Sequence, residues 1–353
     1  MSEILALVSH VIPMALIRRE RQLPAPGTVI ARLNEKVLAS DVIAEGELAP
    51  SHVFLDLVRA LGVHERDVAR YLLHQAGDRL EAGELIAGPA GVGRRTVRAP
   101  APGRIVTFHR GRLLYEVRGK PIGLRAGFPG MIIGTDGTRS VTLETPGALV
   151  QGIWGNGRQE FAMLRTVGGA GESIRSDQLD INLRGALLIG GILNQAGPLQ
   201  QMTQLTVRGL VVGSATFDLV AQLMRMPFPV VLTEGFGEIP MNSAAYGLLT
   251  TSAGREAAID ARMGDAFSQQ RPEIIIPLPA TRKSELPEEV VALTPGTRVR
   301  VLRPPYAGAV GAIRDLPTKA VDYPSGLLAR SALVELEGTG TRSVPLANLE
   351  VIQ

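Results

Sequence analysis

The sequence predicts a multidomain chain that is rich in β-structure and carries one α/β layer. At 353 residues it exceeds the roughly 100–200 residues of one ordinary domain. Its 40 glycines and 24 prolines, beside few aromatic residues, indicate many tight turns and short strands. Between residues 182 and 285 the pattern changes to continuous apolar runs separated by helix-compatible stretches, which is typical of parallel strands buried on both faces.

The N-terminal segment is apolar from residue 4 to residue 17 and is followed by Arg18, Arg19 and Arg21. A secretory signal has the opposite charge order, and a bilayer span needs ~20 apolar residues. We therefore expect a strand pair or core segment here, with a membrane-surface anchor as the alternative, and no integral membrane segment. The absence of cysteine excludes disulfides, thiolate nucleophiles and cysteine-ligated zinc, and it is compatible with the cytoplasmic location that we predict.

Two stretches of the N-terminal third are alike. Residues 23–30 (LPAPGTVI) and 97–106 (VRAPAPGRIV) both place prolines before a glycine turn and a β-branched run. Such repetition suggests two related half-units. Between them, residues 76–87 (AGDRLEAGELIA) contain a Gly-Asp turn, a second glycine and an apolar strand.

Over residues 23–117 this pattern resembles the biotinyl/lipoyl-like barrel-sandwich hybrid, and we assign residues 1–125 to such a domain. Carriers of that family present a modifiable lysine at a hairpin tip. Lys36 and Lys120 are the only lysines of the region and neither has that context, so we reject a carrier role and expect no cofactor.

Residues 51–75 form an insert of this predicted domain. Their apolar residues largely follow helical spacing, and Gly62 interrupts the run, so we expect two short helices that contact partners. His52, His64 and His74 lie too far apart to share one helical turn, and no carboxylates flank them in a ligand pattern. We predict no metal site.

A basic stretch runs from residue 91 to residue 125, where Glu116 is the only acid. Such a cluster attracts phosphate or an acidic partner surface, and the alternative is a solvated sheet face. The candidate nucleic-acid or partner-binding residues of this stretch are Arg94, Arg95, Arg98, Arg104, Arg110 and Arg112.

Residues 126–181 predict two to four antiparallel strands. Asp136-Gly137 is a hairpin signal, because this pair populates the positive φ values of a type I′ turn. Trp154, the single tryptophan, stands among glycines, which suits a packed corner or a small-molecule contact.

The α/β layer at residues 182–285 is expected to be Rossmann-like. Runs at 185–191, 209–214 and 229–235 predict parallel strands, with helices near 198–206, 216–226 and 243–249 and a fourth, edge strand at 273–277. Ligands bind such layers at the carboxyl ends of the strands. The candidate ligand residues there are Asn194, Ser214, Thr216, Thr233, Glu234, Gly235 and Gly237.

No catalytic constellation accompanies these loops. They match neither a dinucleotide fingerprint nor a Walker loop, and Glu234 and Glu238 stand without a histidine or serine–histidine partner. We assign no catalytic residue and regard an enzyme as the weaker hypothesis.

Residues 286–353 alternate valine with arginine at 298–301 and continue through a tyrosine, Gly308 and Gly311 to an isoleucine return. This pattern resembles the KOW motif, which implies an SH3-like barrel and contact with RNA, polymerase or ribosomal protein. The residues that the resemblance assigns to such contacts are Arg298, Arg300, Arg303 and Tyr306.

The sequence leaves three functions open. The first is a non-enzymatic scaffold or adaptor that binds a protein partner or a second copy of itself. The second is an RNA- or transcription/translation-associated factor that uses the KOW barrel and the basic stretch. The third is a ligand sensor or enzyme at the α/β strand ends.

Overall fold

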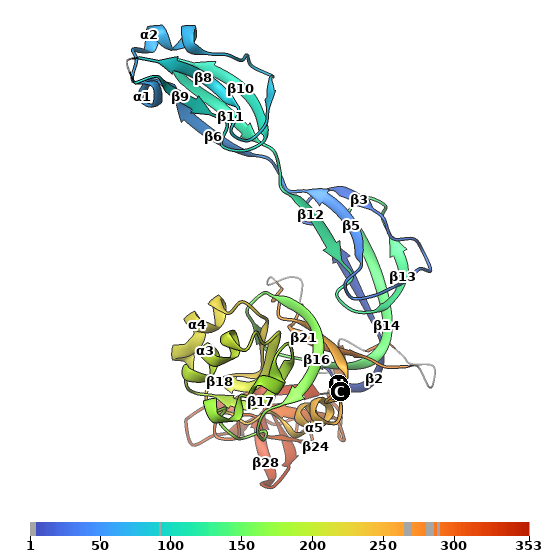
Figure 1. The fold of residues 1–353 in the computed structure, drawn as a ribbon. Helices are drawn as coiled ribbons and strands as arrows, with labels where there is room; N and C mark the ends of the chain where they lie inside the picture. Colours follow the sequence, from blue (N-terminus) through green and yellow to red (C-terminus); the bar gives the residue numbers. More distant parts are fainter. Residues whose placement is uncertain (1–4, 92, 265–269, 280–285, 288–289, 353) are drawn as a thin grey trace.

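The computed structural model describes residues 5–91, 93–264, 270–279, 286–287 and 290–352. The molecule is β-rich, with several mixed sheets and few helices. A body made of the α/β layer and a C-terminal sheet carries two small β-units in series (Figure 1). We call the unit next to the body the proximal unit and the unit beyond it, residues 51–117, the distal unit.

The largest sheet has eleven strands and extends from the body into the proximal unit. Along the sheet the strands are β15 (Trp154–Gly155), β19 (Val230–Phe236), β18 (Gly209–Ala215), β17 (Leu187–Leu193), β16 (Gln159–Thr166), β20 (Glu256–Asp260), β21 (Glu273–Pro277), β14 (Ser140–Gln151), β13 (Gly130–Thr135) and β4 (Lys36–Val37), and β2 (Val11–Gln22) pairs with β14. The sheet therefore crosses the predicted boundaries at residues 125 and 181.

The three predicted parallel strands are β17, β18 and β19, and they pair in parallel, with β16 as a fourth parallel strand. The predicted edge strand at residues 273–277 is wrong in its position. It is β21, which lies between β20 and β14 and is antiparallel to both. Its isoleucines are buried, so the strand needs a neighbour on each side.

Helices cover both faces of the parallel strands. One core contains side chains from α3 (Gly197–Gln204) and α4 (Val220–Arg225), and the other contains side chains from α5 (Ser243–Thr251). These helices match the three predicted ones. Short 3-10 turns precede the layer or follow β18: η2 (Ser176–Gln178), η3 (Ile181–Leu183) and η4 (Phe217–Leu219).

The C-terminal sheet includes a strand from the N-terminus. Its order is β22 (Val290–Ala292), β1 (Leu5–Ser9), β29 (Leu349–Ile352), β23 (Arg298–Val301), β24 (Val310–Asp315), β27 (Ser331–Leu336) and β28 (Gly340–Pro345), with β25 (Val321–Asp322), β26 (Leu328–Ala329) and η5 (Leu346–Asn348) outside it. β1 is parallel to β29, so the N-terminal strand lies outside the predicted domain at residues 1–125.

The distal unit is a sandwich of a four-stranded and a two-stranded sheet. Its strands are β6 (Ser51–Asp56), β7 (Arg79–Leu80), β8 (Leu85–Ala90), β9 (Arg95–Arg98), β10 (Gly103–His109) and β11 (Arg112–Val117), and its helices are α1 (Leu57–Leu61), α2 (Glu65–Val68) and η1 (Ala69–Tyr71). The predicted insert at 51–75 is therefore helical only from residue 57 to residue 71. Residues 51–56 form an edge strand of the four-stranded sheet.

The proximal unit repeats the strand pairing of the distal unit. It uses β2, β4, β13 and β14 of the large sheet and a second sheet of β3 (Gly27–Val29), β5 (Val42–Glu47) and β12 (Pro121–Arg125). Gly130 pairs with Val37 as Gly103 pairs with Leu80. The bulges also agree, because β13 and β10 both shift register against their partners one residue after an isoleucine.

Residues 97–106 therefore repeat a different segment of the chain from the predicted residues 23–30. By strand register, residues 97–105 correspond to 124–132, and residues 77–87 correspond to 34–44. The pairing of 97–106 with 23–30 as halves of one unit is wrong. The distal unit is a second copy of the framework, inserted between β5 and β12 of the first.

Candidate functional site

A chain of buried charges joins the α/β layer to the C-terminal sheet. Arg300 Nη1 donates to Glu234 Oε2 at 2.7 Å, and Arg300 Nη2 contacts Glu350. Arg271 bonds Glu350 from its other side, and Glu234 accepts bonds from Asn242. Because both carboxylate oxygens of Glu234 accept hydrogen bonds from the protein, the carboxylate acts as a structural link between two parts of the body.

The pKa directions within this chain agree with a permanently charged link. Burial alone lowers the pKa of Arg300, but the carboxylates of Glu234 and Glu350 outweigh it and raise that pKa. Burial raises the pKa of Glu350, whereas Arg300 and Arg271 together bring it below its usual value. Arg300, a residue proposed for partner contact, is thus buried at 2% exposure and does not reach the surface.

Most of the other candidate ligand residues lie at or just after the carboxyl ends of β17, β18 and β19, as predicted, but Thr233 lies in the middle of β19. Asn194 Nδ2 donates to Glu238 at 2.9 Å, and Ser214 Oγ bonds the backbone of Ile239. Thr233 is buried, and Gly235 and Gly237 adopt positive φ. Asn194 Oδ1 and Thr216 Oγ1 are buried without a partner among the described residues, although both residues are partly exposed.

Trp154 occupies a packed corner. Its ring meets Phe236 edge-on with centroids 5.4 Å apart, and Phe217 meets Phe236 at 5.5 Å. Trp154 and Phe236 lie against the core that contains α3 and α4, whereas Phe217 is exposed. The packing interpretation of Trp154 therefore fits its surroundings.

The other barrel candidates have unequal exposure. Arg298 pairs with Glu337 at 3.2 Å on the surface, Arg303 is exposed, and Tyr306 packs partly buried against the core of the C-terminal sheet. The alternation of residues 298–301 predicts a half-exposed strand, but β23 turns Arg300 toward the α/β layer. These residues do not form one exposed basic surface.

The candidates of the basic stretch are all exposed and all lie in the distal unit. Arg104 binds Glu116, and Arg98 donates to the carbonyl of Gly83. Across the described part of the chain, no acidic side chain pairs with the remaining four, Arg94, Arg95, Arg110 and Arg112.

Phe54 is not among the functional residues that the sequence predicts. This side chain stands on β6 with 74% exposure, in the same sheet as Arg104 and Arg112. Residues 53–55 are a continuous apolar run without alternation, so periodicity gives no signal that Phe54 lies on an open face.

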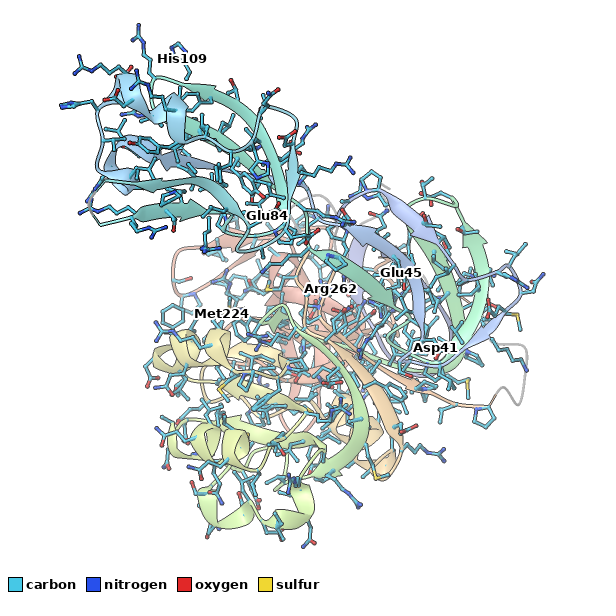
Figure 2. All side chains as sticks on the ribbon, turned by 45° about the horizontal axis from the view of Figure 1, so that its top comes forward. Asp41, Glu45, Glu84, His109, Met224 and Arg262 are labelled. Carbon is cyan, nitrogen blue, oxygen red and sulfur yellow. The ribbon has the colours of Figure 1, made fainter. Side chains whose placement is uncertain are left out.

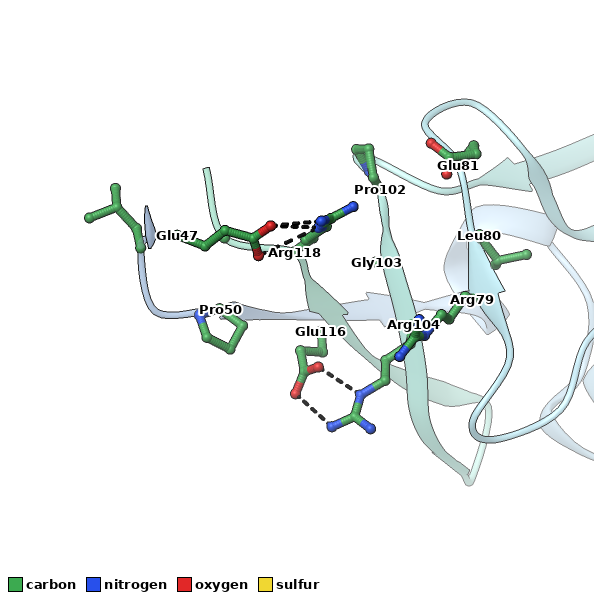
Figure 3. A pocket seen from close by; sticks show the side chains of 12 residues that line it. Glu47, Pro50, Arg79, Leu80, Glu81, Pro102, Gly103, Arg104, Glu116 and Arg118 are labelled. Carbon is green, nitrogen blue, oxygen red and sulfur yellow. Dashed lines mark hydrogen bonds and ion pairs between the residues drawn. The ribbon is translucent and has the colours of Figure 1, made fainter. Parts of the chain in front are cut away.

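The junction of the two β-units is hollowed, as Figure 3 shows. A cavity of about 430 Å³ lies there between residues of both units. Its walls carry two ion pairs, Arg118–Glu47 and Arg104–Glu116, each at 2.6 Å. In each pair the two charges neutralise each other, so neither pair is available to hold a charged ligand.

No cluster of histidines and carboxylates able to hold a metal ion occurs within the described residues. None of their helices is both long and apolar enough to cross a membrane. No family model and no curated protein matches the sequence.

Proposed function

We propose that this protein is a non-enzymatic scaffold of the cytoplasm, which self-associates through its proximal unit and holds its distal unit away from the body. We also assign the two β-units to barrel-sandwich hybrids, the parallel layer to a Rossmann-like fold and the C-terminal sheet to a KOW-type SH3-like barrel. The matched strand pairing of the units, the parallel order of β17 to β19 and the order of the C-terminal strands support these assignments.

The observation that carries the self-association is the exposed leucine pair of the proximal unit. Leu33 and Leu38 are 57% and 65% exposed, whereas the corresponding distal residues are Ala76 and Glu81. The turns are the same: Leu38 N donates to Asp41 as Glu81 N donates to Glu84. The framework therefore does not require leucine at this surface. Burial of the two leucine side chains against another chain would stabilise an assembly.

A second copy of this chain fits the leucine pair best. The surrounding surface carries Arg32 and Lys36 together with Glu35 and Asp41. Two cations and two anions on one patch are self-complementary, which a two-fold interface between identical surfaces requires. An interface of this kind places two distal units on one assembly.

The body supports a non-enzymatic role. Glu234, the carboxylate best placed among the predicted ligand residues, is held by Arg300 and Asn242. A general base needs a free lone pair within reach of its substrate. The burial of Arg300 and the pairing of Arg298 likewise weaken the proposal that the C-terminal sheet binds RNA.

Static light scattering across a concentration series tests the proposal with Leu38→Glu, which introduces the residue of the matched distal turn. We expect the native chain to exceed its monomer mass of 37.6 kDa and L38E to approach it, because two glutamates would face each other across the two-fold axis. Glu81→Leu, on the distal unit, is the matched control and should keep the native mass. A monomeric native chain at every concentration, or an L38E variant of unchanged mass, would refute self-association through this surface.

A further inference from the structure

The four-stranded sheet of the distal unit has one face turned away from its core. Strand pairing sets three rows of side chains on this outer face, because the rows between them bury Leu113, Tyr115 and Ile105. The rows, from the far end of the unit inward, are Asp56–Arg112–His109, Phe54–Leu114–Thr107 and His52–Glu116–Arg104, and Arg79 continues the last row. Figure 2 shows His109 at the far end.

The charge of this outer face is predominantly positive. Arg79, Arg104 and Arg112 with two histidines stand against Asp56 and Glu116. Asp56 caps α1 through the backbone of Arg59, and Glu116 is held by Arg104 and His52. Arg79 and Arg112 make no ion pair with any residue that the structure describes, so their guanidinium groups face solvent.

The proximal unit serves as an internal control for what the framework needs. By strand register, Phe54 corresponds to Glu20, Arg112 to Ser140 and Arg104 to Met131. The same pairing and the same bulge form with those residues. The sheet therefore forms without the exposed ring and the guanidinium groups. Their position on the outer face makes them accessible to a ligand.

We propose that the outer face of the distal unit binds single-stranded nucleic acid. The open ring of Phe54 offers a platform on which a base can stack. The row of Arg112 and the row that ends in the unpaired Arg79 lie about 7 Å to either side along the strands. Guanidinium groups at that separation can meet phosphates on both sides of a stacked base. This inference goes beyond the proposed self-association, which uses the proximal unit.

The outer face favours a single strand over the other anionic macromolecules. A duplex hides the faces of its bases inside the stack, so it gains the arginine contacts but not the contact with Phe54. An acidic polypeptide likewise pairs with arginine and has no planar ring to cover an isolated phenylalanine. Both alternatives therefore predict that Phe54 contributes little to binding.

The test is fluorescence anisotropy of labelled single-stranded RNA and DNA oligonucleotides titrated with the full chain at several salt concentrations. Phe54→Glu and Arg112→Ser introduce the residues of the matched proximal positions. We expect F54E to weaken binding about tenfold or more through loss of stacking. R112S should weaken it several-fold and lower the salt slope by about one phosphate contact.

Arg70→Ser is the matched charge control. Arg70 is exposed in η1, which contacts β8 of the other sheet of the distal unit, so its loss should change affinity less than twofold. Circular dichroism establishes that each variant is folded. Preference for either RNA or DNA agrees with the proposal.

Several results overturn the proposal. They are no binding in low salt, equal binding of the matching duplex, full displacement of the oligonucleotide by polyglutamate at equal charge, or equal affinity of F54E and native protein. Light scattering of L38E is independent of all of them, so failure of nucleic-acid binding and failure of self-association are separate outcomes.

Discussion

The proximal and distal units share one strand framework but are attached to the molecule in different ways. Strands β2 and β14 of the proximal unit continue into the body, and its core includes Ala258 and Ile275 of body strands. The distal unit has a core of its own, and at its junction with the proximal unit one exposed ion pair joins Arg118, which follows β11, to Glu47. The same strand framework therefore occurs twice: the proximal unit is continuous with the sheet of the body, and the distal unit is a separate module with its own core.

The largest change in stability is expected where the proximal unit joins the body, and it should distinguish that junction from the one between the two units. Asp260 Oδ2 lies 2.9 Å from Arg21 Nη1, and both side chains are 5% exposed where the proximal unit joins the body. Burial lowers the pKa of Arg21, and Asp260 opposes that shift. Asp260→Ala leaves Arg21 buried without this partner, so we expect a loss of about 3–5 kcal/mol in the free energy of unfolding measured with urea.

The control for this change is Glu47→Ala, which breaks the exposed pair with Arg118 at the other junction. Solvent screens that pair, so its loss should leave the urea midpoint unchanged. Equal effects of the two substitutions would show that the two junctions do not differ as the burial of their charges implies.

A smaller effect should show where each unit ends. A Cβ built on Gly103 lies 2.1 Å from the carbonyl oxygen of Glu116, and one on the corresponding Gly130 lies 2.6 Å from that of Glu144. Gly→Ala at either site overpacks a strand pair and should cost about 1–3 kcal/mol. For G103A, amide hydrogen exchange should become faster only within residues 51–117. For G130A it should become faster in the proximal unit and also along β14 where that strand continues into the body.

Gly247→Ala is the control for these two substitutions, since a Cβ there meets nothing within 4 Å and alanine favours the helix α5. Faster exchange throughout the body in G103A would contradict an independently folded distal unit.

Local patterns were sufficient to predict much of the secondary structure. The parallel strands, their three helices and the strands β23 and β24 of the C-terminal sheet follow from apolar runs and turn residues. The Asp136–Gly137 hairpin between β13 and β14 also forms. These features depend on residues close together in the sequence, where periodicity and turn chemistry are informative.

Features that depend on distant partners were not predictable in this way. The prolines before Gly27 and Gly103 look alike, yet the strand register matches Gly103 to Gly130. The alternation around Arg300 indicates a half-exposed strand, but Glu234 and Glu350 compensate its charge in the interior. Because these carboxylates come from other strands, only the tertiary structure identifies Arg300 as a buried link and leaves Phe54 on an open face.

The smallest expected change in stability concerns the β13–β14 turn. In the proximal unit an aspartate side chain accepts backbone hydrogen bonds of this turn, and in the distal unit none does so among the described residues. Asp136 Oδ1 accepts bonds from the backbone N–H groups of Arg139, Ser140 and Thr138, which lower its pKa from 3.8 to about 2. The corresponding distal residue is His109, which has no such bonds among the described residues. Asp136→Asn should therefore reduce the stability of the proximal unit.

The pH dependence of this loss follows from the direction of the shift. A carboxyl whose folded pKa is depressed stabilises the fold fully above its unfolded value of 3.8, and that contribution falls as the pH drops toward about 2. The difference in unfolding free energy between native protein and D136N should be constant near neutral pH and shrink between about pH 4 and pH 2. A difference that stays constant down to pH 2 would mean that the turn is held by its backbone geometry, as in the distal unit, and not by the charge of Asp136.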